Sequence, residues 1–376
     1  MKISSSFDGG NISCRRITSP QDIQLEILKD HNSDFYQWFY FRLTGAADQD
    51  CQLKIVNAGG AAYTAGWEGY QAAASYDRDD WFRVPTSFDG ETLTISHCPQ
   101  RDSVYYAYFA PYSMERHADL IADCLDDPRV RLSMLGNTLD GQDLDLLEVA
   151  SGEAQGRKIC WLIARQHPGE TMAEWWMEGF LDRLLQTHDP IARALLEKAV
   201  FYIVPNMNPD GSRRGHLRTN AAGANLNREW DAPTLDRSPE VFHVLNKMKE
   251  TSVDFLLDVH GDEALPYNFI AGTEGIPSHS QRLENLNLAF QAALRRACPD
   301  FQSEKGYGRN RPKSGNLSMA GNAIAETFDC LAMTLEQPFK DSAITPDTRV
   351  GWSPERCRKL GAASLDALFS VLDQLR

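Results

Sequence analysis

Two residues of types that bind metal ions stand three positions apart near the middle of the chain. His167 and Glu170 belong to the stretch His-Pro-Gly-Glu, between the apolar run 158–164 and the amphipathic run 171–186. The first run has the length of a strand buried on both faces, and the second has apolar residues at helical spacing. On the turn between them, an imidazole and a carboxylate can supply two ligands of a two-His-one-Glu zinc site. Taken alone, the pair also fits a surface histidine beside a carboxylate that complements a helix N-terminus, and only the rest of the chain can decide between the two.

A third ligand is found by considering where the predicted strands end. The sequence contains nine histidines, and His260 is the one that directly follows a buried strand, predicted at 254–259. In open α/β sheets the ligand site lies at the carboxyl ends of the strands, so His260 can meet His167 and Glu170 there. Three protein ligands leave a fourth position for water, as a catalytic zinc site requires. We therefore predict a site for one zinc ion.

A zinc-bound water needs a general base, and a carboxylate suits that role. Glu336 ends the strand predicted at 330–335 and is our candidate. Its alternative role is that of a rim carboxylate paired with Lys340. Glu263 is a competing candidate for the base, in the loop just beyond His260.

The segment 206–230 is a long, polar, glycine-containing loop. A loop of this length inside a compact domain usually has a function. Arg218 can stabilise a developing oxyanion. Asn227 and Arg228 can bind a carboxylate through charge-assisted hydrogen bonds. The neighbouring arginines at 213 and 214 are expected to be solvated charges.

The elements that position these residues divide the chain into two parts. Up to about residue 110 the pattern is strand-like, with runs at 36–43, 53–56 and 92–96, and it predicts a small antiparallel β-sandwich. Beyond residue 112, strands and helices alternate, which is typical of an α/β domain. We predict an N-terminal β-sandwich domain over 1–112 and an α/β domain over 113–376.

Composition limits the possible classes of protein. The chain has 376 residues, 42% of them hydrophobic, and a formal charge of −14. An acidic chain of this kind is not expected to bind nucleic acid or an anionic membrane, since both require a basic excess. Eight cysteines are spread singly without a C-x-x-C pair, and no run approaches the length of a membrane helix. Residues 1–10 contain no apolar core of the kind a secretory signal has, so we do not expect one. We therefore predict reduced cysteines and a cytoplasmic protein.

Five motifs, in order, resemble those of a known family. They are His-Pro-Gly-Glu, Asn-Pro-Asp-Gly, Leu-Asn-Arg-x-Trp, a strand-borne His-Gly and Thr-Leu-Glu. This set resembles the zinc metallocarboxypeptidases related to carboxypeptidase A. The closer match is the cytosolic carboxypeptidase subfamily, which includes tubulin deglutamylases and bacterial relatives. The aromatic run 36–41 and the segment 109–113 look like the signature of its N-terminal β domain. The resemblance implies an antiparallel β-sandwich ahead of a mixed-sheet α/β catalytic domain with helices on both faces.

The resemblance also implies a role for each matching residue. The zinc ligands are His167, Glu170 and His260, and the general base is Glu336. Arg218 matches the residue that polarises the scissile carbonyl. The clamp on the substrate's C-terminal carboxylate is Asn227 with Arg228.

This chain departs from the family pattern in three places. Where carboxypeptidase A has an aspartate two residues before the Asn-Arg pair, this chain has Asn225, which can orient a ligand histidine only through its carbonyl. We expect weaker polarisation of the zinc for that reason. No tyrosine lies between Tyr307 and Glu336, so the mobile tyrosine of the digestive enzymes has no assigned counterpart. Acid-specific members carry a basic residue in the substrate pocket, for which the nearest candidates are Arg309, Arg311 and Lys313.

These observations predict a two-domain zinc carboxypeptidase that hydrolyses the C-terminal peptide bond of a peptide or protein. Release of acidic residues, glutamate above all, is a hypothesis. One alternative is a zinc amidohydrolase that acts on N-acyl amino acids, as in the succinylglutamate desuccinylase and aspartoacylase group. Another is a protein-binding module with a catalytically inactive fold. The sequence does not predict an oligomeric state.

Overall fold

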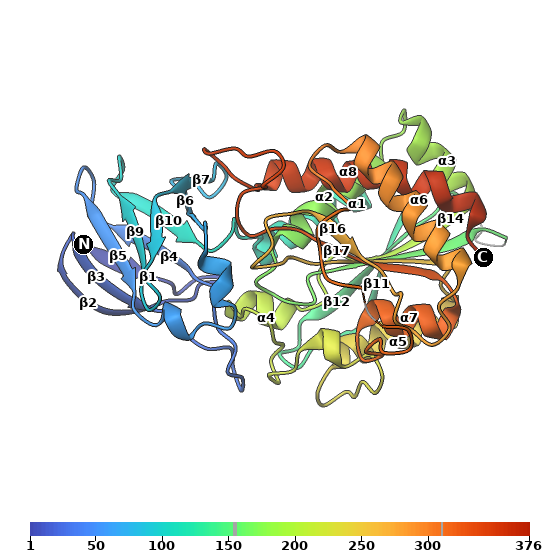
Figure 1. Ribbon diagram of the computed structural model, residues 1–376, viewed down its shortest axis with the longest axis horizontal. Helices are drawn as coiled ribbons and strands as arrows, with labels where there is room; N and C mark the ends of the chain where they lie inside the picture. Colours follow the sequence, from blue (N-terminus) through green and yellow to red (C-terminus); the bar gives the residue numbers. More distant parts are fainter. Residues whose placement is uncertain (153–155, 310) are drawn as a thin grey trace.

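A computed structural model describes residues 1–152, 156–309 and 311–376. Figure 1 shows a β-rich part at one end of the molecule and a sheet flanked by helices at the other. The predicted fold class, a β-sandwich followed by an α/β domain, is therefore confirmed. No helix within the described residues is long and apolar enough to cross a membrane.

The N-terminal part consists of two five-stranded sheets. Neighbouring strands are antiparallel throughout, except for one parallel pair, β3 with β5. In spatial order, the first sheet contains β1 (Lys2–Ser4), β4 (Tyr40–Thr44), β10 (Ser103–Ala107), β6 (Ala72–Ser75) and β7 (Phe82–Val84). The second contains β2 (Ser13–Ser19), β3 (Asp22–Glu26), β5 (Cys51–Ile55), β9 (Leu93–His97) and β8 (Thr86–Phe88). Two short 3-10 helices follow β5, η1 (Ala58–Gly60) and η2 (Thr64–Trp67).

The aromatic run 36–43 is only partly a strand, because β4 begins at Tyr40. Ahead of β4, the buried side-chain amide of Gln37 forms two hydrogen bonds with the backbone of Tyr63. Its Nε2 donates to the carbonyl of Tyr63 at 3.0 Å, and its Oε1 accepts from the N–H of Tyr63 at 2.8 Å. The prediction of one long strand was wrong here, because the backbone ahead of Tyr40 bonds irregular segments: the carbonyl of Tyr36 accepts from the N–H of Ala62 at 3.1 Å, and that of Phe39 from the N–H of Tyr108 at 2.9 Å.

The C-terminal part is built on a seven-stranded mixed sheet. The strand order is β11 (Val130–Asn137), β12 (Asp143–Val149), β14 (Ala199–Val204), β13 (Lys158–Ala164), β15 (Phe255–Val259), β17 (Leu331–Glu336) and β16 (Phe269–Ala271). The four central strands are parallel, and the outer ones are antiparallel to their neighbours. Ala164 pairs with Val259, which pairs with Leu335. Strands β13, β15 and β17 therefore end at the same level of the same sheet edge.

Helices cover both faces of this sheet, as expected (Figure 1). One face carries α1 (Met114–Leu125), α2 (Met172–Leu184), α3 (Pro190–Lys198), α6 (Gln281–Ala297) and α8 (Pro354–Val371), which ends in η4 (Leu372–Gln374). The other carries α5 (Pro239–Thr251) and α7 (Ala320–Phe328). Alternate residues of β13 serve the two cores: Cys160 and Leu162 pack into the first, and Trp161 and Ile163 into the second. This is why the strand is apolar throughout.

The long loop after β14 contains a short helix that the sequence analysis did not predict, α4 (Pro209–Arg214). Asn208 caps it, with its Oδ1 accepting from the N–H of Gly211 at 3.0 Å. Gly215 ends it in a left-handed conformation, with φ 68°. An asparagine cap, a proline in the first turn and a glycine after the end are ordinary helix signals, so this element was readable from the sequence. The same loop later forms η3 (Leu226–Arg228).

Candidate active site

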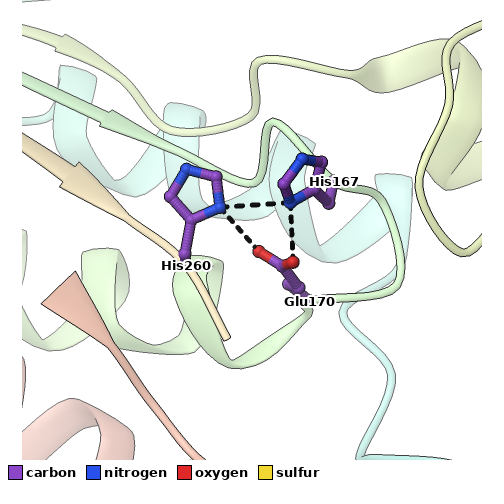
Figure 2. Close-up of side chains that lie close together, drawn as sticks. All are labelled: His167, Glu170 and His260. Atoms are coloured by element: carbon purple, nitrogen blue, oxygen red, sulfur yellow. Dashed lines mark hydrogen bonds and ion pairs between the residues drawn. The ribbon is translucent and has the colours of Figure 1, made fainter. Parts of the chain in front are cut away.

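Three buried side chains converge at the carboxyl edge of the sheet (Figure 2). The Nδ1 atom of His167 lies 2.7 Å from Glu170 Oε1, and the Nδ1 atom of His260 lies 2.8 Å from Glu170 Oε2. The two Nδ1 atoms are 3.2 Å apart. One possible ligand atom from each of the three residues lies within 4.8 Å of the others. The structure thus brings together the three residues that the sequence proposed as metal ligands.

The opposite nitrogens of the two imidazoles show that this cluster fits a cation. His167 Nε2 lies 3.0 Å from Asn225 Oδ1, and His260 Nε2 lies 2.9 Å from Asp258 Oδ2. Both oxygens are acceptors, so each ring can keep a proton on Nε2 while its Nδ1 binds a cation. The two Nδ1 atoms and the Glu170 carboxylate face one point between them. Two nitrogens with one carboxylate are a donor set that suits zinc.

Arg165 fixes the turn that carries His167 and Glu170. Its backbone lies in the left-handed region with φ 59°, which is uncommon for a residue with a side chain. Its buried guanidinium donates to the carbonyl of Pro168 at 2.9 Å and to Glu174 Oε2 at 2.7 Å. The ion pair with Glu174 on helix α2 and the bond across the turn hold the strained conformation in place.

Gly169 connects this turn to the long loop. Its N–H donates to the carbonyl of Leu217 at 2.9 Å. A Cβ atom at this position would lie 3.0 Å from the same carbonyl oxygen, closer than side chains normally approach. The metal-binding turn therefore packs directly against the backbone next to Arg218, and the glycine permits this close approach.

Glu336 lies at the end of β17 with one carboxylate oxygen free. Its Oε2 is buried and has no hydrogen-bond partner among the described residues, while its Oε1 accepts from the Tyr307 hydroxyl at 3.3 Å. Burial, together with the nearby Glu170 carboxylate, raises the pKa of this carboxyl to about 8. A bound cation would lower the pKa again, because it favours the charged form. A buried carboxylate with a free oxygen and a pKa near neutrality is suited to proton transfer.

Tyr307 is a site residue that the sequence reasoning did not assign. Besides its contact with Glu336, its hydroxyl donates to Asp262 Oδ2 at 2.6 Å. Asp262 in turn accepts from the N–H groups of Ala264 and Leu265, at 2.8 and 2.6 Å. Burial and the two carboxylates raise the pKa of the phenol, so Tyr307 stays protonated and can donate. The sequence did not indicate the contact between Tyr307 and Glu336, because it depends on how the loop that contains Tyr307 folds back.

Two arginines of the long loop lie near the cluster without a carboxylate partner. Within the part of the chain that the structure describes, neither Arg218 nor Arg228 forms an ion pair. The Nε atom of Arg218 is buried without a hydrogen-bond partner. Burial and the charge of Arg218 both lower the pKa of His167, to about 4. Burial and Arg218 also lower the pKa of Arg228. Two mutually repelling cations of this kind favour an anionic ligand.

The side chain of Asn227 is buried, and its amide oxygen is already hydrogen-bonded. Its Oδ1 accepts from the N–H of Ala320 at 2.9 Å, which fixes the amide. Its Nδ2 lies 3.4 Å from His260 Nε2 and remains able to donate to a ligand. The structure therefore places Asn227 beside the three proposed ligands, with one donor group available.

Two family models match the sequence. One, described as the cytosolic carboxypeptidase N-terminal domain, matches residues 3–109. The other, described as zinc carboxypeptidase, matches residues 124–341. The chain belongs to the zinc carboxypeptidase family. It is therefore a metallocarboxypeptidase of the cytosolic carboxypeptidase type, and the family implies zinc as the metal and peptides as substrates. The domain boundary that we expect near residue 112 stays a prediction.

Known structures and relatives agree with this assignment. The carboxypeptidase is similar to a candidate carboxypeptidase A from Shewanella denitrificans, with 54% identity, a TM-score of 0.98 and 100% coverage of both chains. It is also similar to a metallo-carboxypeptidase from Pseudomonas aeruginosa, with 45% identity, a TM-score of 0.98 and 100% coverage of both chains. Cytosolic carboxypeptidase 3 of Bos taurus is 25% identical over 407 residues, which cover 98% of this chain and 40% of that protein. The carboxypeptidase thus spans less than half of this animal relative.

Asn225 occupies the position where an aspartate was expected, and it contacts the ring of His167 through its carbonyl oxygen. The same Oδ1 accepts from the N–H of Asn227 at 3.1 Å, which fixes its orientation. A neutral amide oxygen polarises the Nε2–H bond less than a carboxylate does, so the imidazole is a weaker donor toward a metal.

Replacing Asn225 should change how tightly the carboxypeptidase holds zinc. We expect Asn225→Ala to weaken zinc affinity about 10- to 100-fold, because the partner that orients His167 is lost. Asn225→Asp should strengthen it, because a carboxylate raises the basicity of the imidazole. Zinc dissociation constants from competition with a fluorescent chelator test both. Equal affinities in all three proteins would contradict a role for this contact.

The proposed basic residues of the substrate pocket do not lie together. A cavity of about 300 Å³ beside Glu336 is lined by Arg309 but by neither Arg311 nor Lys313. The guanidinium of Arg309 also pairs with Glu284, at 2.5 Å between Nη2 and Oε1. Of the three candidates, only Arg309 is placed to contact a substrate side chain in this cavity.

Proposed function

We propose that the enzyme removes the last residue of a peptide or protein chain by hydrolysing its C-terminal peptide bond. The observation that carries this proposal is that Arg218 and Arg228, beside the proposed zinc ligands, form no ion pair with any described carboxylate. A free C-terminal carboxylate can bind Arg228 in a bidentate manner. Asn227 can add a donor through its Nδ2. This clamp would place the preceding peptide carbonyl next to the metal ligands and Arg218.

We assign His167, Glu170 and His260 as the ligands of a single zinc ion. When bound, zinc supplies a Lewis acid and lowers the pKa of its water to about 7. Residues of the chain then transfer the protons and stabilise the charge that develops in the reaction. Glu336 takes a proton from the attacking water through its unpartnered Oε2. Arg218 donates to the carbonyl oxygen as negative charge develops there.

Glu336 and Tyr307 together can complete the proton transfer. The proton that Glu336 takes up is needed by the amine that leaves when the peptide bond breaks, and the same carboxyl can deliver it. The Tyr307 hydroxyl, which contacts Glu336 and remains protonated, can donate to the substrate as the bond breaks. Glu263 is buried as well, and burial with the charge of Glu170 holds its pKa well above the usual range. We favour Glu336 because it ends β17, in register with the strand that leads to His260, and because its buried Oε2 has no hydrogen-bond partner among the described residues.

The cavity beside Glu336 suits the side chain of the released residue. Its volume of about 300 Å³ is near the lower limit of typical ligand pockets. We propose an acidic side chain, glutamate above all, because Arg309 is the cationic group that lines the cavity. The carboxylate of Glu274 also lines it and opposes this preference.

A basic residue is the second candidate for release. The related metallo-carboxypeptidase from Pseudomonas aeruginosa was crystallised with (2-guanidinoethylmercapto)succinic acid, which joins two carboxylates to a guanidinium group. In this chain, Glu274 could receive such a cationic side chain. The two candidates differ in which charged residue of the cavity binds the substrate.

Profiling of C-terminal trimming across a peptide library by mass spectrometry tests the function and separates the two candidates. We expect peptides with a C-terminal glutamate to lose that residue fastest, and Arg309→Gln to raise KM for them about tenfold, the effect of one lost charge-assisted bond. Arg311→Gln, the matched control outside the cavity, should leave KM unchanged. Faster release of lysine or arginine would favour the second candidate. No trimming of any peptide, with hydrolysis of N-acyl glutamate instead, would overturn the carboxypeptidase assignment.

We also place the enzyme in the cytoplasm. All eight cysteines are free, and six of them are buried. Free cysteines in such number favour a reducing compartment.

A further inference from the structure

The segment 213–219, which contains Arg218, is hydrogen-bonded to the N-terminal domain at several points. The N–H of Gly9 donates to the carbonyl of Arg213 at 3.0 Å. Asn11 Nδ2 donates to the carbonyl of Gly215 at 2.8 Å. Further along, the N–H of His31 donates to the Nε2 atom of His216, at 3.1 Å. A Cβ atom on Gly215 would lie 2.7 Å from the carbonyl oxygen of Gly9, which shows how closely the two backbones approach.

Asp30 of the N-terminal domain then holds the backbone at Arg218 itself. Its carboxylate accepts from three successive N–H groups, those of Leu217 at 2.7 Å, Arg218 at 2.8 Å and Thr219 at 2.9 Å. It also accepts from the Thr219 hydroxyl at 3.1 Å. Asp30 is 3% exposed, so these charge-assisted bonds form away from bulk water. Four bonds to one carboxylate fix the direction in which the Arg218 side chain leaves the loop.

Two aromatic rings of the same domain hold the guanidinium. The Cζ atom of Arg218 lies 5.4 Å from the centroid of the Tyr63 ring and 5.6 Å from that of the Phe35 ring. The two rings are nearly parallel, at 22°, with centroids 6.4 Å apart. Cation–π contact stabilises a guanidinium at these distances. Since no carboxylate among the described residues pairs with Arg218, the rings fix its position without neutralising its charge.

We propose that the N-terminal domain positions Arg218 for catalysis, with Asp30, Phe35 and Tyr63 as the positioning residues. This inference rests on the proposed function, in which Arg218 stabilises the developing oxyanion. A free loop arginine would have to be ordered during each turnover. An arginine already held toward the carbonyl donates without that reorganisation. The β-sandwich would therefore be part of the catalytic apparatus.

The test compares kcat and KM of full-length variants on the library peptide that is trimmed fastest. We expect Tyr63→Leu and Asp30→Ala to lower kcat about tenfold or more, with KM little changed and zinc content intact, since misplacing a catalytic group by a fraction of an ångström has effects of this size. Tyr63→Phe keeps the ring and should restore nearly all of kcat. This rescue would not be expected if the hydroxyl were what matters.

The same domain offers matched controls. Asp89 also accepts from backbone N–H groups, those of Glu91 and Thr92, but in an exposed turn. The Cζ atom of Arg101 lies 5.2 Å from the centroid of the Tyr76 ring, a cation–π contact like that of Arg218 with Tyr63. Asp89→Ala and Tyr76→Leu should therefore leave kcat unchanged. A loss of kcat in these controls equal to that in the test variants would overturn the proposal, because it would reveal a general effect of domain stability.

Arg218→Ala separates failure of this inference from failure of the proposed function. We expect it to lower kcat about 10²-fold or more, as loss of an oxyanion donor does. Added to Arg218→Ala, the change Tyr63→Leu should have no further effect, because both act through one group. If Arg218→Ala lowers kcat and Tyr63→Leu does not, the inference is wrong and the proposed function stands. If Arg218→Ala leaves kcat unchanged, the role proposed for Arg218 is itself wrong.

Discussion

Glu336→Gln should lower kcat for C-terminal trimming about 10²- to 10⁴-fold, the range in which positioned acids and bases contribute. The amide has the shape of the carboxylate but cannot take a proton. The unpartnered Oε2 of Glu336 is then no longer a base, while the His167, Glu170 and His260 cluster is untouched. We therefore expect normal zinc content and a KM within a few-fold of wild type. Steady-state kinetics together with metal analysis of the same preparation provide the measurement.

Glu263→Gln is the matched control for this variant. Glu263 is as buried as Glu336 and was the competing candidate for the base. We expect its replacement to cost much less activity, because Glu263 lies in the loop beyond His260 and not at the end of β17. The reverse result, with Glu263→Gln inactive and Glu336→Gln active, would show that the base has been assigned to the wrong carboxylate.

Removing a histidine of the cluster should abolish both zinc binding and activity. His260→Ala deletes one of the two Nδ1 donors and leaves Glu170 without one of its partners. The metal supplies several kcal/mol of transition-state stabilisation, which corresponds to a loss of about a thousandfold or more in kcat. Elemental analysis after gel filtration should find less than a tenth of the wild-type zinc. Added zinc should restore chelator-treated wild type and leave His260→Ala inactive.

The control for this prediction is a histidine outside the site. His188 is exposed in the turn after α2, so His188→Ala should retain full zinc content and activity. His260→Ala that keeps one zinc per chain and normal activity would contradict the assignment of the ligands.

The strands and their ends were predictable because the parallel strands are buried on both faces and read as unbroken apolar runs. His167, His260 and Glu336 each follow such a run, and the shared register of β13, β15 and β17 brings them together. The role of a carbonyl at Asn225 could also be foreseen, since only the carbonyl of an amide can accept from an imidazole N–H as a carboxylate does.

What the sequence could not predict depends on contacts between distant segments. Tyr307 reaches Glu336 because a loop after α6 folds back over the sheet edge, and nothing in its local sequence specifies that path. Asp30, Phe35 and Tyr63 meet Arg218 across the domain interface, almost two hundred residues away along the chain for Asp30. The contact between Asp258 and His260 was easier to predict from the sequence. A charged residue within a buried strand needs a partner, and His260, two positions later, is that partner.

The most direct test of the central claim is a crystal structure of the purified enzyme with an anomalous difference map recorded at the zinc absorption edge. We expect a single strong peak, about 2.0–2.2 Å from Nδ1 of His167, Nδ1 of His260 and the Glu170 carboxylate, with Glu336 beside the open position. A peak bound elsewhere, or no zinc among these three residues in an enzyme that still trims peptides, would contradict it.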